Sequence, residues 1–244
     1  MKDILVIGDS CQDVFAYCNC NRLCPEVPAP VLNFHHQIKS GGMAKNVIRN
    51  IESLDVSCDL LTNSDWNNIT KTRYVDIDTN YMFARVDSHI SVRPISLNDI
   101  NFDYKIIIIS DYNKGFLTKV DIDTICTSHR CVFLDTKKIL GDWAKEAKYI
   151  KINHTEYARS KESNAIDKIL ETKIIRTAGP AGCFFNGDQY SVDEVEVRDV
   201  SGAGDSFMAG LVVAYLRTDD IIKSIAFANE CATSAVQKRG VSTI

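Results

Sequence analysis

The segment with the clearest chemical potential is a glycine-rich stretch, Asp-Val-Ser-Gly-Ala-Gly-Asp over residues 199–205, that leads into a helix-period run. Small residues at a helix start leave the first N–H groups approachable, and these groups carry a partial positive charge. The stretch therefore predicts a phosphate-binding site formed by Gly202, Ala203 and Gly204. Asp205 follows directly and is placed to accept a proton from a substrate hydroxyl.

A tight turn with Asp205 as a helix cap is the structural alternative. The whole string is more specific than that, because it resembles the C-terminal signature of the ribokinase-like (phosphofructokinase B type) carbohydrate kinases. The resemblance implies an ATP-dependent kinase in which Asp205 is the catalytic base and the backbone of residues 202–204 is the anion hole. In such phosphoryl transfer the protein contributes mainly positioning and charge stabilisation.

The same resemblance implies a sugar site. Gly41 and Gly42 begin a segment that is similar to the family's Gly-Gly-x-x-x-Asn motif, which ends at Asn46. Paired glycines let a sugar press against the backbone, and the Asn46 amide offers hydrogen bonds to hydroxyls. Asp13 matches the family's acceptor of a sugar hydroxyl. A phosphorylated sugar would also need cations, for which the candidates are Lys45, Arg49, Lys114 and Arg85. The alternative for each cation is a solvated surface charge.

Further segments that resemble the family's motifs imply a nucleotide-binding site. Asn153 and Glu156 resemble the family's Asn-x-x-Glu motif, which organises Mg²⁺ and phosphates through water, although this spacing also fits a helix cap. Thr177, Gly179 and Gly182 resemble the nucleotide loop, and Asn229 matches the region lining the adenine. Asp199 and Ser201 match positions that bind a monovalent cation in some members. ATP, Mg²⁺ and, as a further option, K⁺ are the expected cofactors.

Within the family, the chain resembles the heptose 7-phosphate kinases in several segments, namely residues 7–9, 23–31, 110–115, 134–137 and 238–244. It is shorter than a typical member around Ser64 to Asn68, next to the expected sugar pocket. The exact acceptor is therefore open, and another sugar, an aminosugar or a nucleoside remains an alternative. A catalytically weak sugar-binding protein with the same fold is an alternative of a different class.

Strand-like and helix-like segments alternate along the chain. Short apolar runs predict strands at 4–8, 59–62, 106–109, 132–134, 149–152, 174–175 and 183–185. Helix-period stretches occupy 43–54, 119–128, 139–147, 164–171, 204–216 and 219–238. This order predicts an α/β protein, a ribokinase-like three-layer sandwich with a mostly parallel central sheet. Ligands of such sheets bind at the carboxyl ends of the strands.

Two segments, 14–40 and 70–87, break this alternation and predict a small β-strand lid, the second with a turn at Asp78, Thr79 and Asn80. Residues 1–13, 41–69 and 88–244 would then form the kinase body. The alternative is an ordinary edge hairpin on the main sheet. A homodimer through the lid is a further option, because small β lids leave apolar edges to cover.

Composition also limits the partners, location and metal content that we expect for this protein. A net charge of -4 argues against nucleic acid as a partner, and no apolar run is long enough for a membrane span. Nine cysteines without a signal-like leader indicate free thiols in a cytoplasmic protein. Cys18, Cys20 and Cys24 offer zinc binding as a minor alternative. His35 and His36 do not, since adjacent strand residues point to opposite faces.

Overall fold

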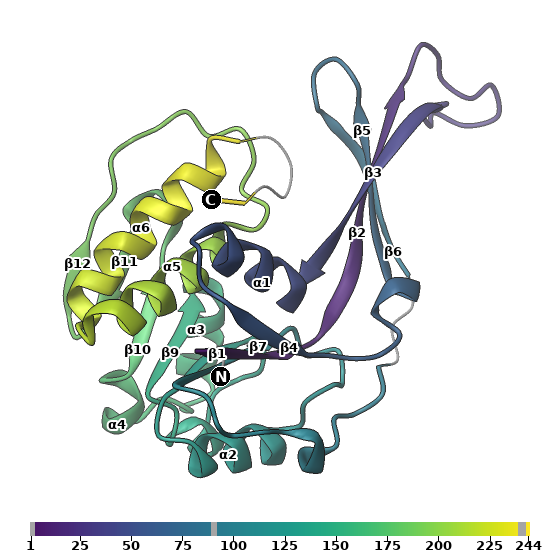
Figure 1. The fold of residues 1–244 in the computed structure, drawn as a ribbon. Helices are drawn as coiled ribbons and strands as arrows, with labels where there is room; N and C mark the ends of the chain where they lie inside the picture. The colour runs from purple at the N-terminus through teal and green to yellow at the C-terminus, as the bar shows by residue number, and fades with distance from the viewer. Residues whose placement is uncertain (1–2, 89–91, 239–242) are drawn as a thin grey trace.

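An eight-stranded sheet forms the centre of the computed structural model, which describes residues 3–88, 92–238 and 243–244 (Figure 1). Its order is β12-β11-β10-β9-β8-β7-β1-β4, and every pairing from β10 to β4 is parallel. The strands are β1 (Ile4–Gly8), β4 (Cys58–Leu61), β7 (Ile106–Asp111), β8 (Val132–Thr136), β9 (Tyr149–Asn153), β10 (Ile174–Thr177), β11 (Cys183–Phe185) and β12 (Asp188–Tyr190).

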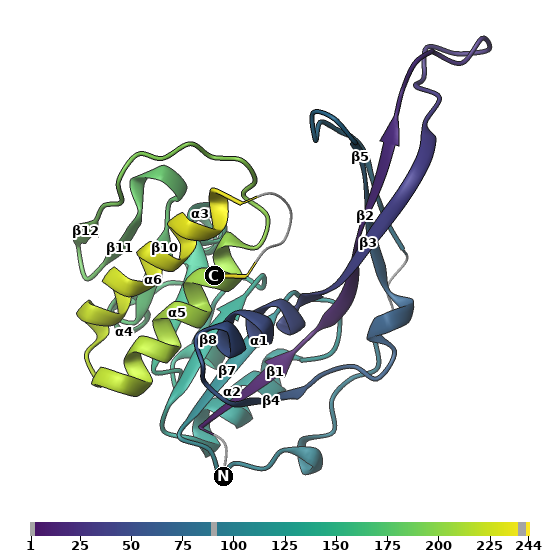
Figure 2. The same ribbon diagram turned by 45° about the horizontal axis from the view of Figure 1, so that its top comes forward.

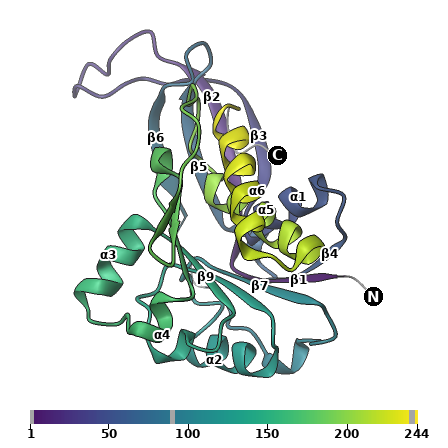
Figure 3. The ribbon, with the colours of Figure 1, turned by 90° about the vertical axis from the view of Figure 1, so that its left-hand side faces the viewer.

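Helices cover both faces of this sheet (Figure 3). One face carries α1 (Ala44–Ser53), α5 (Ala203–Thr218) and α6 (Ile221–Val236); the other carries α2 (Lys119–Ser128), α3 (His154–Glu162) and the short α4 (Lys168–Glu171). The strand β1 and residues 106–109 of β7 are apolar throughout, because both faces of the central sheet are covered. The predicted three-layer α/β architecture is confirmed.

A second, four-stranded sheet projects from this body (Figures 1 and 2). Its order is β3-β2-β5-β6, with β2 (Ser10–Asn19), β3 (Asn33–Met43), β5 (Thr70–Asp76) and β6 (Met82–Asp87). The strand β2 follows β1 with only Asp9 between them. Residues 10–13 and 41–43, which the sequence analysis assigned to the body, lie within strands of the small sheet. The division into body and lid stays a prediction.

Several local expectations need correction. The predicted helix at 139–147 is wrong: it holds only the 3₁₀ turn Asp142–Ala144, preceded by Gly141 in an extended conformation. Leu140, Ala144 and Ala147 are buried, so packing rather than helix formation explains the apolar spacing. The helix predicted at 164–171 is reduced to α4, while α3 and the strand β12 were missed, and β2 begins at Ser10, ahead of the predicted lid segment 14–40. The remaining 3₁₀ turns are Trp66–Asn68, Leu97–Asp99 and Gly179–Ala181.

All nine cysteines are free thiols, and most are buried. Within the described ranges, no three side chains of the His, Cys, Asp or Glu types gather closely enough to hold a metal ion. A search of the same residues for a helix long and apolar enough to cross a membrane finds none.

Candidate active site

A polar cavity of about 350 Å³ lies between the small sheet and the carboxyl edge of the main sheet. It is enclosed by residues of both parts of the fold, and charged side chains dominate its walls. The lining residues are Asp13, Met43, Lys71, Arg73, Arg85, Asp87, Tyr112, Lys114, Lys137, Gly202 and Asp205.

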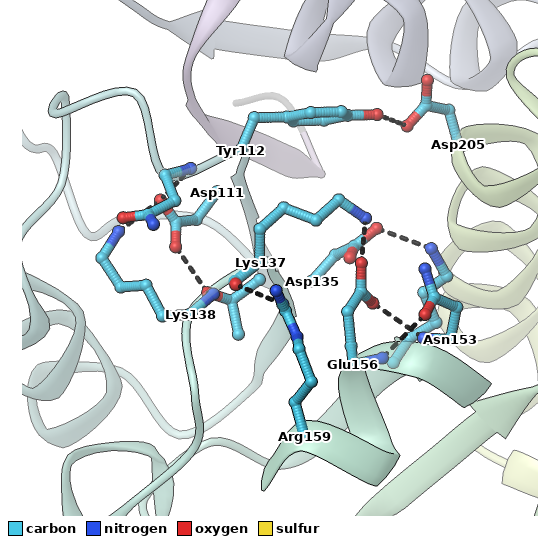
Figure 4. Close-up of polar contacts among 12 residues, drawn as sticks. Asp111, Tyr112, Asp135, Lys137, Lys138, Asn153, Glu156, Arg159 and Asp205 are labelled. Atoms are coloured by element: carbon cyan, nitrogen blue, oxygen red, sulfur yellow. Dashed lines mark hydrogen bonds and ion pairs between the residues drawn. The ribbon is translucent and has the colours of Figure 1, made fainter.

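The carboxylate of Asp205 is held from two sides at the wall of this cavity. Gly202 precedes the helix α5 with φ 84°, a conformation that suits glycine, and Asp205 lies in the first turn of the helix. The Tyr112 hydroxyl donates to Oδ1 at 2.7 Å (Figure 4), and Nδ2 of Asn46 donates to Oδ2 at 2.8 Å. Both donors come from other elements, so the tertiary fold fixes the orientation of this carboxylate.

Burial raises the pKa of Asp205 above its ordinary value, while the hydrogen bonds from Tyr112 and Asn46 and the charge of Lys151 act in the opposite direction. Only 5% of the residue is exposed. A carboxylate with a raised pKa is a stronger base than one on the surface. Asp205 can therefore accept a proton from a group in the polar cavity.

A buried ammonium group lies against the start of α5. A Cβ added to Gly204 would stand 2.8 Å from Nζ of Lys151, so glycine leaves room for this side chain. Lys151 pairs with Asp135 at 2.7 Å, and both side chains are almost completely buried. The first N–H groups of the helix and this cation together favour an anion beside Gly204.

The cations of the polar cavity come mostly from the small sheet. In the register of this sheet, Lys71 of β5 lies between Asp13 of β2 and Asp87 of β6. Two residues further along β5, Arg73 lies beside Arg85 of β6. Arg73 pairs with Asp13 at 3.0 Å. Arg85 donates to both oxygens of Asp87, at 2.7 and 2.9 Å.

Lys71 differs from these arginines, because it has no carboxylate within ion-pair distance among the described residues. Its Nζ lies 5.1 Å from the centre of the Tyr112 ring, and burial lowers its pKa. The sequence analysis missed Lys71, Arg73 and Tyr112. The signal for the first two is their period-two spacing within β5, which puts them on one face of the strand.

The predicted acceptor residues fall into two groups. Asp13, Arg85 and Lys114 line the polar cavity, and Asn46 reaches it indirectly through Asp205. A Cβ on Gly42 would be 2.2 Å from Oδ2 of Asp13, so this glycine makes room for that carboxylate.

The other group lies outside the lining of the polar cavity. Gly41 lies close to the Lys45 side chain, which a Cβ at this position would meet. Nζ of Lys45 lies 4.0 Å from the centre of the Trp66 ring. Arg49 is also outside, and its Nη1 is buried without a hydrogen-bond partner among the described residues. Lys45 and Arg49 thus do not line the polar cavity with Asp205 and Asp13.

An apolar cavity of about 540 Å³ adjoins the other side of the start of α5. Ala203 and Gly204 line it, whereas Gly202 and Asp205 line the polar cavity. The first turn of α5 is therefore shared by both cavities. The predicted nucleotide residues lie together in the apolar one: Thr177, Gly179, Gly182 and Asn229. Most of its lining is small or apolar, which suits a flat aromatic base, and Asp193 and Glu194 also line it.

The motif of Asn153 and Glu156 is a helix cap in this structure. Oδ1 of Asn153 accepts from the Glu156 amide at 2.9 Å, and Oε2 of Glu156 accepts from the Asn153 amide at 2.8 Å. Oε1 of Glu156 pairs with Nζ of Lys137 at 2.6 Å (Figure 4). Asn153 also lines a cavity with Thr177 and Gly179. Because these oxygens already accept hydrogen bonds, they fit a magnesium ion held through water better than one bound directly.

The two residues suggested for a monovalent cation form a local turn. The Ser201 amide donates to Oδ1 of Asp199 at 2.8 Å. Both line a third cavity of about 310 Å³, which also reaches Arg73 and Arg85 of the small sheet. Their role in cation binding stays a prediction.

The structure thus combines a ribokinase-like fold with a helix start that favours an anion, a buried carboxylate beside it and a cavity on either side. The chain belongs to the pfkB family of carbohydrate kinases, whose sequence pattern matches residues 120–244. The predicted class of enzyme, an ATP-dependent carbohydrate kinase, is thereby confirmed.

Bifunctional proteins named HldE are among the curated relatives. That of Helicobacter pylori strain ATCC 700392 / 26695 is 30% identical, and the match covers 98% of this chain and 64% of the relative. That of Blochmanniella floridana is 26% identical, covering 100% of this chain and 61% of the relative. The chain thus spans less than two thirds of these relatives. The first match extends over 299 positions, more than the 244 residues here, so the relative carries segments that this chain lacks.

Solved structures confirm the fold. A ribokinase from Thermotoga maritima matches with a TM-score of 0.75 at 16% identity, covering 99% of this chain and 95% of the other. A nucleoside kinase from Methanocaldococcus jannaschii matches with a TM-score of 0.73 at 19% identity, covering 99% and 93%. The resemblance noted at residues 238–244 falls largely outside the described residues.

Proposed function

We propose that this chain transfers the γ-phosphoryl group of ATP to a hydroxyl of a phosphorylated sugar, in the manner of a heptose 7-phosphate kinase, with Asp205 as the general base. The observation that carries this proposal is the position of Asp205 at the helix start shared by the polar and apolar cavities. The nucleotide occupies the apolar cavity, and the sugar occupies the polar one.

In the proposed step the acceptor hydroxyl loses its proton to the Asp205 carboxylate as its oxygen forms a bond to the γ-phosphorus. The bond from that phosphorus to the β,γ-bridging oxygen breaks, and ADP leaves. The backbone amides of residues 202–204, supported by the Lys151 charge, stabilise the transferring group. Mg²⁺ would neutralise phosphate charge, with Asn153 and Glu156 holding it through water. K⁺ near Asp199 and Ser201 belongs to the same proposal.

The charges of the polar cavity support an anionic acceptor. Lys71 and Lys114 both line it, and neither has a carboxylate at ion-pair distance among the described residues. A phosphate group would compensate these cations, whereas a neutral sugar would not. The HldE relatives support a heptose phosphate in particular.

A homodimer through the lid is part of the proposal. Both edge strands of the small sheet carry exposed apolar side chains, which another copy of the sheet would cover. These are Phe34 and Ile38 on β3 and Met82 and Val86 on β6.

The test is ADP release from ATP with a panel of acceptors: heptose 7-phosphate, fructose 6-phosphate, the unphosphorylated sugars, an aminosugar and a nucleoside. We expect turnover with a phosphorylated sugar. Asp205→Asn should lower kcat by about 10²–10⁴-fold, the usual contribution of a general base, with nearly unchanged ATP affinity. Asp123→Asn, on the remote helix α2, is the control.

Near-normal turnover of Asp205→Asn would remove the base assignment. A protein that binds ATP but releases no ADP with any acceptor would favour the alternative of a sugar-binding protein. Faster turnover with an unphosphorylated sugar or a nucleoside would show that the acceptor is not a phosphorylated sugar, while the proposed roles of ATP and Asp205 would stand.

A further inference from the structure

Tyr112 lines the polar cavity and contacts Asp205 directly, and the sequence analysis gave it no role. It follows β7 in a tight loop, in which Asn113 and Gly115 have positive φ angles of 55° and 105°. The buried carboxylate of Asp9 fixes this loop by accepting from the amides of Tyr112 at 2.8 Å and Phe116 at 3.3 Å. The phenol is therefore placed by backbone contacts that do not depend on a substrate.

The hydroxyl of Tyr112 is held as a permanent donor. Burial and the charges of Asp205 and Asp135 raise the pKa of Tyr112 well above its ordinary value, so the phenol keeps its proton across the working pH range. Two ammonium groups flank the ring: Nζ of Lys71 lies 5.1 Å from its centre and Nζ of Lys137 lies 5.3 Å from it. Such cation–π contacts hold the ring in place.

We propose that Tyr112 is a positioning residue that holds the Asp205 carboxylate in one orientation and in its ionised form, ready to accept the proton of the acceptor hydroxyl. This inference rests on the proposed function of Asp205 as the base. The Tyr112 and Asn46 hydrogen bonds engage one oxygen each. A carboxylate oxygen accepts two hydrogen bonds, so each retains capacity for a proton.

The Tyr112 hydrogen bond affects how the activity of Asp205 as a base depends on pH. The groups around Asp205 are Tyr112 after β7, Asn46 on α1, Asp135 on β8, Lys151 on β9 and Lys137 after β8. The Tyr112 hydrogen bond stabilises the ionised carboxylate and so lowers the pKa of Asp205. Its removal raises that pKa, and the base is then protonated, and inactive, at a higher pH than before.

The experiment compares Tyr112→Phe with Tyr104→Phe in the full chain. Tyr104 is a matched control because its hydroxyl also donates to a carboxylate, that of Asp59, at 2.7 Å, away from the polar cavity. For Tyr112→Phe we expect the acid limb of kcat/KM against pH to move up by about one to two units, the effect of one hydrogen bond to a charged group. We also expect kcat to fall roughly tenfold with little change in acceptor KM.

A second readout needs no turnover. In protein labelled with ¹³C at the aspartate carboxyl carbon, the Asp205 signal is identified by its absence in Asp205→Asn, and its titration is followed by NMR. We expect the Asp205 pKa to rise by the same amount in Tyr112→Phe and to stay unchanged in Tyr104→Phe. ATP affinity reports folding, because Tyr112 does not line the apolar cavity.

An unchanged titration of Asp205 in folded Tyr112→Phe would overturn the inference. A rise in acceptor KM at constant kcat, with no movement of the acid limb, would also overturn it and make Tyr112 a substrate-binding residue. If the wild-type chain phosphorylates no acceptor, the proposed function fails, while the NMR titration still decides whether Tyr112 controls the ionisation of Asp205.

Discussion

Variants of the buried ion pair of Lys151 and Asp135 should change the stability and the activity of this protein in different ways. The two groups are 2.7 Å apart, and their side chains are 4% and 5% exposed. Lys151 contacts Oδ2 of Asp135, and Oδ1 has no hydrogen-bond partner among the described residues. Lys151→Met would leave the Asp135 carboxylate buried and uncompensated. We expect the free energy of unfolding to fall by about 3–5 kcal/mol, the usual cost of removing one partner of a buried pair.

The double variant Lys151→Met/Asp135→Leu should recover most of this stability, because replacing both charges by apolar groups removes the uncompensated carboxylate. Activity should not recover with it. The ammonium group that lies against Gly204 would be missing in both variants, and we expect kcat to stay roughly 10²-fold below wild type, comparable to losing one anion-hole donor.

Urea unfolding gives the stabilities, and ADP release gives kcat. Lys105→Met is the control, because its ion pair with Asp3 is exposed and should contribute almost nothing. A loss below about 1 kcal/mol in Lys151→Met would show that the pair is solvated and would refute the reasoning. Full activity in the double variant would show that Lys151 has no part in phosphoryl transfer.

Two further predictions concern the glycine loop and the thiols. Gly182→Ala should lower both Tm and ATP affinity, since its Cβ would stand 2.0 Å from the Tyr190 carbonyl oxygen at φ 78° on the wall of the apolar cavity. Gly187→Ala, at φ 87° with open space around it, should lower Tm only, and equal ATP affinity in both variants would contradict the assignment. Burial raises the pKa of Cys183 to about 12, so at pH 8 its thiol is protonated and should react with a disulfide reagent only after unfolding. Reaction of the Cys183 thiol with the reagent in the folded protein would contradict this prediction.

The sequence by itself determined the layers of the fold and the local motifs of the site. The apolar runs of β1 and of residues 106–109 predict buried parallel strands because both faces of such strands must be covered. Gly202 and Gly204 mark the helix start, because small residues there leave the first N–H groups approachable. These are local patterns, and a local pattern is visible in sequence.

Only the tertiary structure decided which side chains meet at Asp205. Tyr112 is 93 residues away from it in the chain and Asn46 is 159 residues away, and no local spacing predicts either contact. The same holds for the contact of Lys45 with Trp66, which no spacing in the sequence predicts. A charge on a helix or strand becomes part of a site only through the direction of its side chain. The packing of distant elements sets that direction, and the spacing of residues along one element carries no information about this packing.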